Sequence, residues 1–184
     1  MKKLVFIPVL LAIACLFSGT YGAVHNQISY TISPEYFTQF KFHQFQLTDS
    51  PLPNRLNAGI VGWNAAWWMG IIIGLILIPA GLVIRGAKTY FMAMIKVFGI
   101  VTITTLGTGL IALFIAHFTV TSDTAGELTR YGNDISNDVA FARAGTMHNF
   151  SYLGGLLSIF TGSFTIYWQR RQQKQNRRPL KQKA

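Results

Sequence analysis

Three shortages in the sequence exclude whole classes of protein. Charged residues make up 12% of the 184 positions, about half the share that is usual in soluble domains. Because 51% of the residues are hydrophobic, the chain is not disordered, and an ordinary soluble enzyme is disfavoured. The one cysteine, Cys15, lies in an apolar run, which excludes an internal disulfide and every CxxC zinc, haem-attachment or redox motif.

Signatures of catalysis and of ion transport are missing as well. The sequence has no Ser-His-Asp pattern and no Walker motif, and Gly107-Thr108-Gly109 lacks the strand and the lysine of a phosphate-binding loop. Charged residues are absent from the middle of the apolar stretches, which argues against an ion pump or a proton-coupled carrier. No catalytic residue is therefore predicted, and an enzyme is disfavoured.

What the chain has instead is four apolar stretches, over residues 4–22, 59–84, 97–118 and 147–168. Crossing a bilayer takes roughly 20 apolar residues, and a chain of this size cannot bury four such helices in a soluble core. We therefore predict an all-α membrane protein, a single domain over 1–184 whose four transmembrane helices form an antiparallel bundle. Residues 23–58 and 119–146 would connect these helices outside the cytoplasm, and the second of these segments reads as a solvated loop.

The charges predict the orientation of the bundle. Lys and Arg before the first stretch, between the second and third, and after the fourth have no acidic residue among them, whereas all six acidic residues fall in the other two segments. The positive-inside rule therefore places both termini in the cytoplasm. The basic tail, 169–184, would contact anionic lipids, and its closeness to the bilayer disfavours a nucleic-acid partner.

The first stretch has two interpretations. Lys2 and Lys3 precede it, and Thr20 and Gly22 occupy acceptable positions for cleavage of a secretory signal peptide. We favour an uncleaved signal anchor. Both interpretations leave residues 24–58 outside the cytoplasm.

Small residues recur along every stretch, and they predict how the helices pack. The second stretch has Gly62, Ala66, Gly70 and Gly74 at four-residue spacing, which places them on nearly one helix face. Membrane helices associate where small residues let their backbones approach closely. One compact bundle follows, and the alternative use of this stripe is a homodimer or a contact with another membrane protein.

The first external segment is the most strongly patterned part of the chain. Residues 27–32 alternate polar and apolar, as a half-buried strand would, and Ser33-Pro34-Glu35 is typical of a helix start. The short helix that follows carries Tyr36, Phe37 and Phe40, which we expect at the bilayer interface. They would form a lid that lies flat on the bundle or, alternatively, a groove for a substrate or lipid.

Two strings of this sequence resemble a known group of proteins. They are VHNQISYTISPEYFTQFKF at residues 24–42 and RAGTMHNFSYLGG at residues 143–155. Both are similar to strings in uncharacterised, signal-peptide-containing bacterial inner-membrane proteins that are predicted to have four spans. The resemblance covers about a fifth of the chain. It implies the inner-membrane location and supplies no activity.

The histidines are the main candidates for a binding site. His25, His117 and His148 fall near the outer ends of three stretches, and we expect them to meet at the outer mouth of the bundle, with Arg143 and Asn149 nearby. Three imidazoles would suit a transition metal or a haem iron. The alternative is that each ring bonds to backbone or lipid headgroups, and no cofactor is then needed.

Three functions therefore remain open. The least favoured is a small channel formed by oligomers, because the only candidates for a polar pore lining are the threonines Thr102, Thr104, Thr105 and Thr108. Two others rank above it. The first is a non-enzymatic accessory or interaction protein whose aromatic external segment contacts a partner or a lipid. The second is a haem- or metal-binding subunit of the oxidoreductase type that uses the outer histidines. The sequence identifies neither the metal nor the partner.

Overall fold

The computed structural model describes residues 3–176, and most of them are helical. The all-α class is therefore confirmed. In chain order the elements are α1 (Phe6–Ile32), the π-helical turn η1 (Phe37–Lys41), α2 (Phe42–Gln44), α3 (Asn54–Ala66), α4 (Met69–Gly81), α5 (Ala87–Thr119), α6 (Ser122–Ala125), the strands β1 (Thr129–Arg130) and β2 (Asn133–Asp134), which pair antiparallel, and α7 (Asp138–Gln175).

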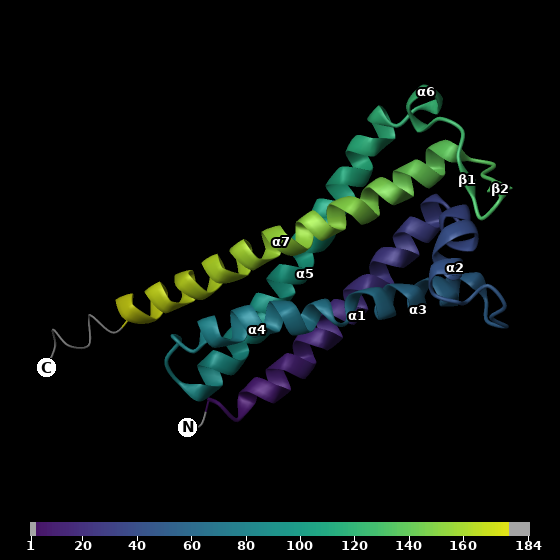
Figure 1. Ribbon diagram of the computed structural model, residues 1–184. Coiled ribbons are helices and arrows are strands. Elements are labelled where there is room, and N and C mark those ends of the chain that lie inside the picture. The colour runs from purple at the N-terminus through teal and green to yellow at the C-terminus, as the bar shows by residue number, and fades with distance from the viewer. Residues whose placement is uncertain (1–2, 177–184) are drawn as a thin grey trace, which may run out of the picture.

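The long helices form two pairs. Helix α1 packs along α3 and then α4, and α5 packs along α7 (Figure 1). The two pairs are joined where α1 contacts α5 and α7, and where α4 contacts α7. The chain enters α1 and leaves α7 at the same end of the molecule, so α1 and α7 run in opposite directions.

Two of these helices, α1 and α5, are long and apolar enough to cross a membrane. Helices α3 and α4 would together make a third crossing, although they bend by 43° at a short break around Trp67 and Trp68. Helix α7 is the longest in the chain. It falls outside this group because serines, threonines and glycines dilute its apolar residues over 147–168.

The small-residue stripe of the second stretch lies against α1, within the same chain. A Cβ atom added at Gly62 would collide with the backbone of Gly22 and Ala23, and one added at Gly70 would lie 2.5 Å from the carbonyl oxygen of Ala14. The hydroxyl of Ser18 also donates a hydrogen bond to the Ala66 carbonyl, at 2.6 Å. Because α1 occupies the stripe, this face of α3 and α4 is not free for a homodimer contact.

The strand expected over residues 27–32 was wrong. These residues form the last turns of α1, whose buried positions Gly22, His25, Asn26 and Ser29 follow a helical spacing. The polar residues were read as one face of a strand, but they face neighbouring helices. Helix α1 ends at Ser33, which takes an extended conformation because the following Pro34 disfavours helical backbone in the residue before it.

The aromatic segment is a cap packed on the helices, and the depth of its rings in a bilayer stays a prediction. Tyr36 and Phe37 are 5% and 0% exposed, and Phe40 is half-buried beside them. Their neighbours come from α3 and α7, among them Val61 and Phe141. The expected helix start at Ser33 is confirmed, since its Oγ accepts a hydrogen bond from the backbone N–H of Tyr36 at 3.2 Å.

One carboxylate joins this cap to the segment before α7. The Glu35 carboxylate accepts hydrogen bonds from the backbone N–H groups of Ser136 and Asn137, at 2.9 and 3.0 Å. Burial acts to raise the pKa of Glu35, but these hydrogen bonds outweigh it and hold the pKa below its ordinary value. The Asn137 side chain in turn caps α7 by accepting from the backbone N–H of Ala140. Residues 138–144 thus form the first turns of α7.

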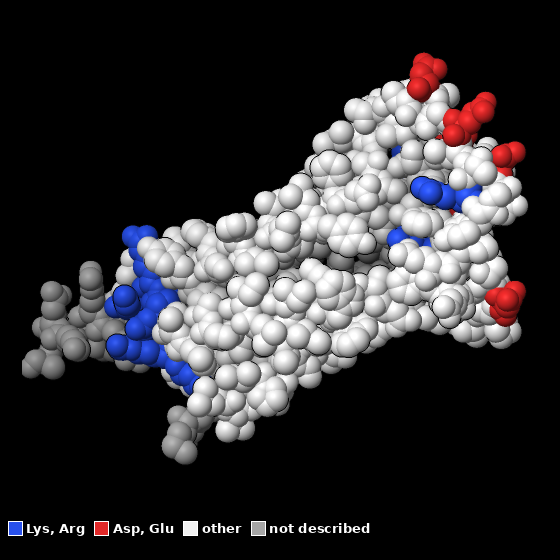
Figure 2. All heavy atoms as spheres, in the orientation of Figure 1, with Lys and Arg blue, Asp and Glu red and all other residues white. Residues whose placement is uncertain are grey.

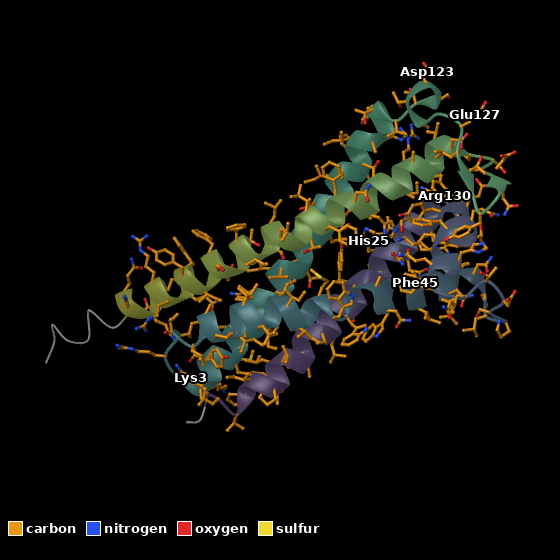
Figure 3. The ribbon with its side chains drawn as sticks, viewed as in Figure 1. Lys3, His25, Phe45, Asp123, Glu127 and Arg130 are labelled. Atoms are coloured by element: carbon orange, nitrogen blue, oxygen red, sulfur yellow. The ribbon has the colours of Figure 1, made fainter. Side chains whose placement is uncertain are left out.

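Charge divides the molecule into two ends (Figure 2). Lys and Arg gather at the basic end, where the α4–α5 turn lies beside the last turns of α7. The red carboxylates lie at the opposite, acidic end, where Asp123 and Glu127 are labelled beside Arg130 (Figure 3). At the basic end, Lys3 Nζ donates to the Leu82 carbonyl at 2.9 Å. Most of the basic residues expected in the tail, those from Arg177 onward, lie outside the described residues.

Candidate functional site

A cavity of about 120 Å³ lies between the two helix pairs. It is visible as a hollow near the middle of the surface in Figure 2. Helices α1, α3, α4, α5 and α7 all contribute to its wall, and Lys41 and Phe45 reach it from the cap. Figure 3 labels His25 and Phe45, two of the residues that line it.

The cavity is polar in one part and apolar in the other. Towards the acidic end its wall holds His25, Lys41, His148 and Ser151, and no carboxylate lines it at any point. Along α1 the lining continues from His25 back to Ala14, a distance of roughly 17 Å at 1.5 Å per residue. There its neighbours are mostly apolar, among them Phe17, Met69, Ile73, Phe98 and Val101. The hydroxyls of Ser18 and Thr105 also line this part, and both donate to backbone carbonyls.

Two of the predicted histidines meet at the polar part. The ring centroids of His25 and His148 lie 4.6 Å apart, with the rings edge to face at 84°. Each ring bonds to a serine of the other helix: Ser151 Oγ lies 2.8 Å from His25 Nε2, and Ser29 Oγ lies 3.1 Å from His148 Nε2. This exchange of contacts joins α1 to α7.

Both ring nitrogens of His25 have a partner. Its Nδ1 lies 3.3 Å from the Asn26 side-chain oxygen, while the Asn26 amide nitrogen donates to the Ala58 carbonyl at 2.9 Å. An oxygen acceptor requires a hydrogen on Nδ1, and Nε2 is paired with the Ser151 hydroxyl. His25, which is 3% exposed, therefore has no ring nitrogen left for a further ligand.

His148 keeps one ring nitrogen available. Its Nε2 is paired with Ser29, and within residues 3–176 no hydrogen bond involves its Nδ1. The ring packs beside Tyr36, with centroids 4.8 Å apart. A second unused group lies near His25: the Tyr21 hydroxyl is buried and has no hydrogen-bond partner among the described residues. Both side chains line the cavity.

Lys41 supplies the cavity's positive charge. Its Nζ donates to the Gln44 side-chain oxygen at 2.9 Å and lies 4.7 Å from the ring centroid of Phe40. In the described part of the chain it forms no ion pair. Burial lowers the pKa of Lys41, since removing an ammonium from water disfavours its charged form.

The remaining predicted residues lie elsewhere. His117 is exposed near the end of α5 and belongs to no group of three metal-ligating side chains in residues 3–176. Arg143 donates through Nη2 to the carbonyls of His117 and Val120, at 2.8 and 3.0 Å, so it stabilises the end of α5. Asn149 is exposed. The expected meeting of three imidazoles is thus a meeting of two.

Ser151, His25 and Asn26 form the hydrogen-bonded order of a nucleophile, a base and an orienting group. Geometry of this kind supports acyl transfer only when donors also stabilise the oxyanion. Ser151 lies inside α7, where the neighbouring backbone N–H groups bond to carbonyls one turn earlier. Its own hydroxyl also lies 2.9 Å from the Met147 carbonyl. The site therefore lacks the backbone oxyanion hole of a hydrolase.

Sequence reasoning missed four polar residues of this site: Asn26, Ser29, Lys41 and Ser151. A usable signal was present for the serines. Ser29 follows His25 by four positions and Ser151 follows His148 by three, so each hydroxyl shares a helix face with a histidine. Lys41 had no such signal, because the turn between α1 and η1 brings it to the cavity.

Comparisons of this chain with protein-family models, with curated proteins and with solved structures found no match. The functional argument therefore starts from the cavity.

Proposed function

We propose that this chain is a multi-pass protein of the bacterial inner membrane that binds an amphiphile in its central cavity and catalyses no reaction. The observation that carries the proposal is the division of the cavity along α1, polar beside His25 and apolar beside Ala14. An amphiphile likewise has a polar headgroup and an apolar chain. The protein would act as an accessory protein that holds such a molecule.

The proposal includes four membrane crossings. Helix α7 lies along α5, which is itself long and apolar enough to span, so a bilayer crossed by α5 also surrounds the apolar part of α7. The basic end then faces the cytoplasm, as the positive-inside rule requires, and both termini lie there. Anionic lipids would contact the basic side chains at this end.

An intact α1 is also part of the proposal. Cleavage after Gly22 would divide this helix and remove Leu10 and Ala14, which are 0% and 4% exposed, from the core. It would also remove the wall of the cavity at Phe17 and Tyr21. We therefore favour the signal anchor over the cleaved signal peptide.

The orientation of the cavity suits a molecule from the outer leaflet. With the acidic end outside, the polar part of the cavity lies towards the headgroup region and the apolar part points towards the middle of the bilayer. A lipid of the outer leaflet has this orientation already. Such a molecule would enter through the opening between the helix pairs without turning over.

A glycine on the cavity wall offers a direct test. A Cβ added at Gly155 meets only the end of the Met69 side chain, at 3.9 Å, so Gly155→Leu fits its helix and fills the cavity. Gly99→Leu is the control, since a Cβ there meets nothing within 4 Å and Gly99 does not line the cavity. Both changes replace a helical glycine by leucine and raise helix propensity equally.

We expect labelled dodecanol to bind to the protein in phosphatidylcholine nanodiscs, above the background of empty discs. Binding should fall at least tenfold in Gly155→Leu and stay unchanged in Gly99→Leu. Absence of binding to the unaltered protein, or equal binding to both variants, would contradict the proposal.

The adjacency of His25 and His148 favours a second candidate, a metal- or haem-binding subunit. The histidine nitrogens that would ligate such a metal or haem iron are poorly placed to do so. Both Nε2 atoms are paired with serines, and residues 3–176 hold no group of three metal-ligating side chains. A Soret band, or stoichiometric zinc or copper that is lost in His148→Ala, would replace the amphiphile proposal by this one.

A further inference from the structure

We infer that the amphiphile held in the cavity is a single-chain carboxylate, whose headgroup bonds to Lys41, Tyr21 and His148. This inference rests on the proposed function and names the chemical class of the ligand. Its basis is an excess of positive charge and hydrogen-bond donors on the cavity wall.

The charge on the wall is unbalanced. Lys41 is the one charged residue that lines the cavity, and no carboxylate of residues 3–176 pairs with it. Its contacts are the Gln44 side-chain oxygen and the rings of Phe40 and Tyr36, none of which neutralises the ammonium. A half-buried cation gains most from an anion, because water screens the attraction less there than at the surface.

Donors are unused on the same wall. The buried Tyr21 hydroxyl has no partner in the described part of the chain, and the nearby Ser151 hydroxyl is already engaged by His25 and the Met147 carbonyl. A buried O–H group loses free energy unless it donates. The Nδ1 of His148 is also unpaired there, and it donates in the tautomer that carries the hydrogen on Nδ1. Carboxylate oxygens accept from several donors at once, whereas an alcohol or an amine supplies one acceptor or none.

The headgroup is small and singly charged. Lys41 is the one lysine or arginine on the wall, so its single charge matches that of a carboxylate, whereas a phosphate monoester carries a second negative charge. A cavity of about 120 Å³ admits a carboxylate and the first methylenes of a chain. The rest of the chain would follow Met69 and Ile73 towards the bilayer.

The test compares three probes of equal chain length: dodecanoate, dodecanol and dodecyltrimethylammonium. Each is titrated into the full-length protein in phosphatidylcholine nanodiscs at pH 8, and empty discs are subtracted. We expect dodecanoate to bind at least tenfold more tightly than dodecanol, and the quaternary ammonium not to bind. Equal affinities for the acid and the alcohol would overturn this inference and leave the proposed function standing. Failure of both to bind would overturn both.

Two basic residues that lie over the Phe40 ring, Lys41 and Arg130, give a matched pair of variants for the dodecanoate test. Lys41→Gln should reduce the affinity for dodecanoate at least tenfold and leave that for dodecanol unchanged, while Lys41→Arg should retain most of it. Arg130→Gln is the control: this guanidinium also stacks on Phe40, at 5.2 Å, but does not line the cavity. An equal loss in Lys41→Gln and Arg130→Gln, or no loss in Lys41→Gln, would overturn the inference.

Discussion

At the scale of single residues, two serines give the histidine pair its character. Ser151 and Ser29 occupy the Nε2 atoms of His25 and His148 across the α1–α7 contact, and Asn26 occupies the other nitrogen of His25. His25 is consequently a structural ring that joins helices. His148, with one nitrogen unused, is the ring that remains available to a ligand.

The two histidines should therefore respond differently to removal. His25→Ala leaves Ser151 and Asn26 without their partner in a buried position, which costs about 1–3 kcal/mol. We expect a clear fall in thermal stability in detergent and in cellular abundance. His148→Ala loses one hydrogen bond, since Ser29 still reaches the His25 carbonyl at 3.3 Å, so it should weaken binding of dodecanoate more than it lowers stability.

His43→Ala serves as the control for both. This ring stacks on Tyr131 at the acidic end, with centroids 4.2 Å apart, and does not line the cavity. It should change neither binding nor abundance appreciably. A stability loss in His148→Ala as large as that in His25→Ala, with unchanged binding, would assign both rings to structure alone.

At the scale of helices, close backbone contact between α1 and the α3–α4 pair positions the site. Gly22 meets Gly62 backbone to backbone, and Gly70 meets Ala14 and Cys15. This contact brings α3 near enough for the Ala58 carbonyl to accept from Asn26, which in turn orients His25. Small residues of the cavity wall thereby fix the geometry of the polar group.

Gly70→Leu should consequently be far more destabilising than Ile72→Leu. A Cβ at Gly70 would lie 2.5–2.6 Å from the α1 backbone, so the helices must separate, at a cost of about 1–3 kcal/mol or more. Ile72 is 43% exposed, and its replacement should cost under about 0.5 kcal/mol. Thermal unfolding in detergent measures both. Similar midpoints for the two variants would mean that the stripe is not an interface.

Much of the helix arrangement could be predicted from the sequence, and the predictions that were wrong failed for physical reasons. Helical spacing and small-residue stripes located the long helices and the face of α3 and α4 that packs, because both depend on local periodicity. The strand over 27–32 was wrong because alternation over six residues fits a helix whose polar side chains face other helices. The aromatic cap and Lys41 depend on how the chain turns at Ser33 and Pro34, which no local pattern encodes.

The histidine site could be predicted only in part, because helical spacing is a local pattern and the direction of a side chain at a helix end is not. Helical phase turned His148 towards α1, and the structure brings it to His25. His117 was expected beside them from its depth alone, but depth does not determine the direction of a side chain, and this residue is exposed at the end of α5.

At the scale of the whole molecule, charge and apolar length define one axis. The carboxylates in Figure 2 lie at one end together with a few basic side chains, and most of the visible basic side chains gather at the other end. The apolar helices α1 and α5 connect the two ends. The cavity takes its direction from this axis: its polar part lies towards the acidic end and its apolar part towards the middle. The proposed ligand, its orientation and its route of entry all depend on which end lies outside the cell.

Cysteine labelling in intact cells tests that orientation most directly. In a Cys15→Ser background, Asp134→Cys at the acidic end should react with a membrane-impermeant maleimide. Gln173→Cys at the basic end should react only after the cells are permeabilised. The reverse pattern, or labelling of both positions in intact cells, would contradict the four-crossing orientation and with it the binding of an outer-leaflet amphiphile.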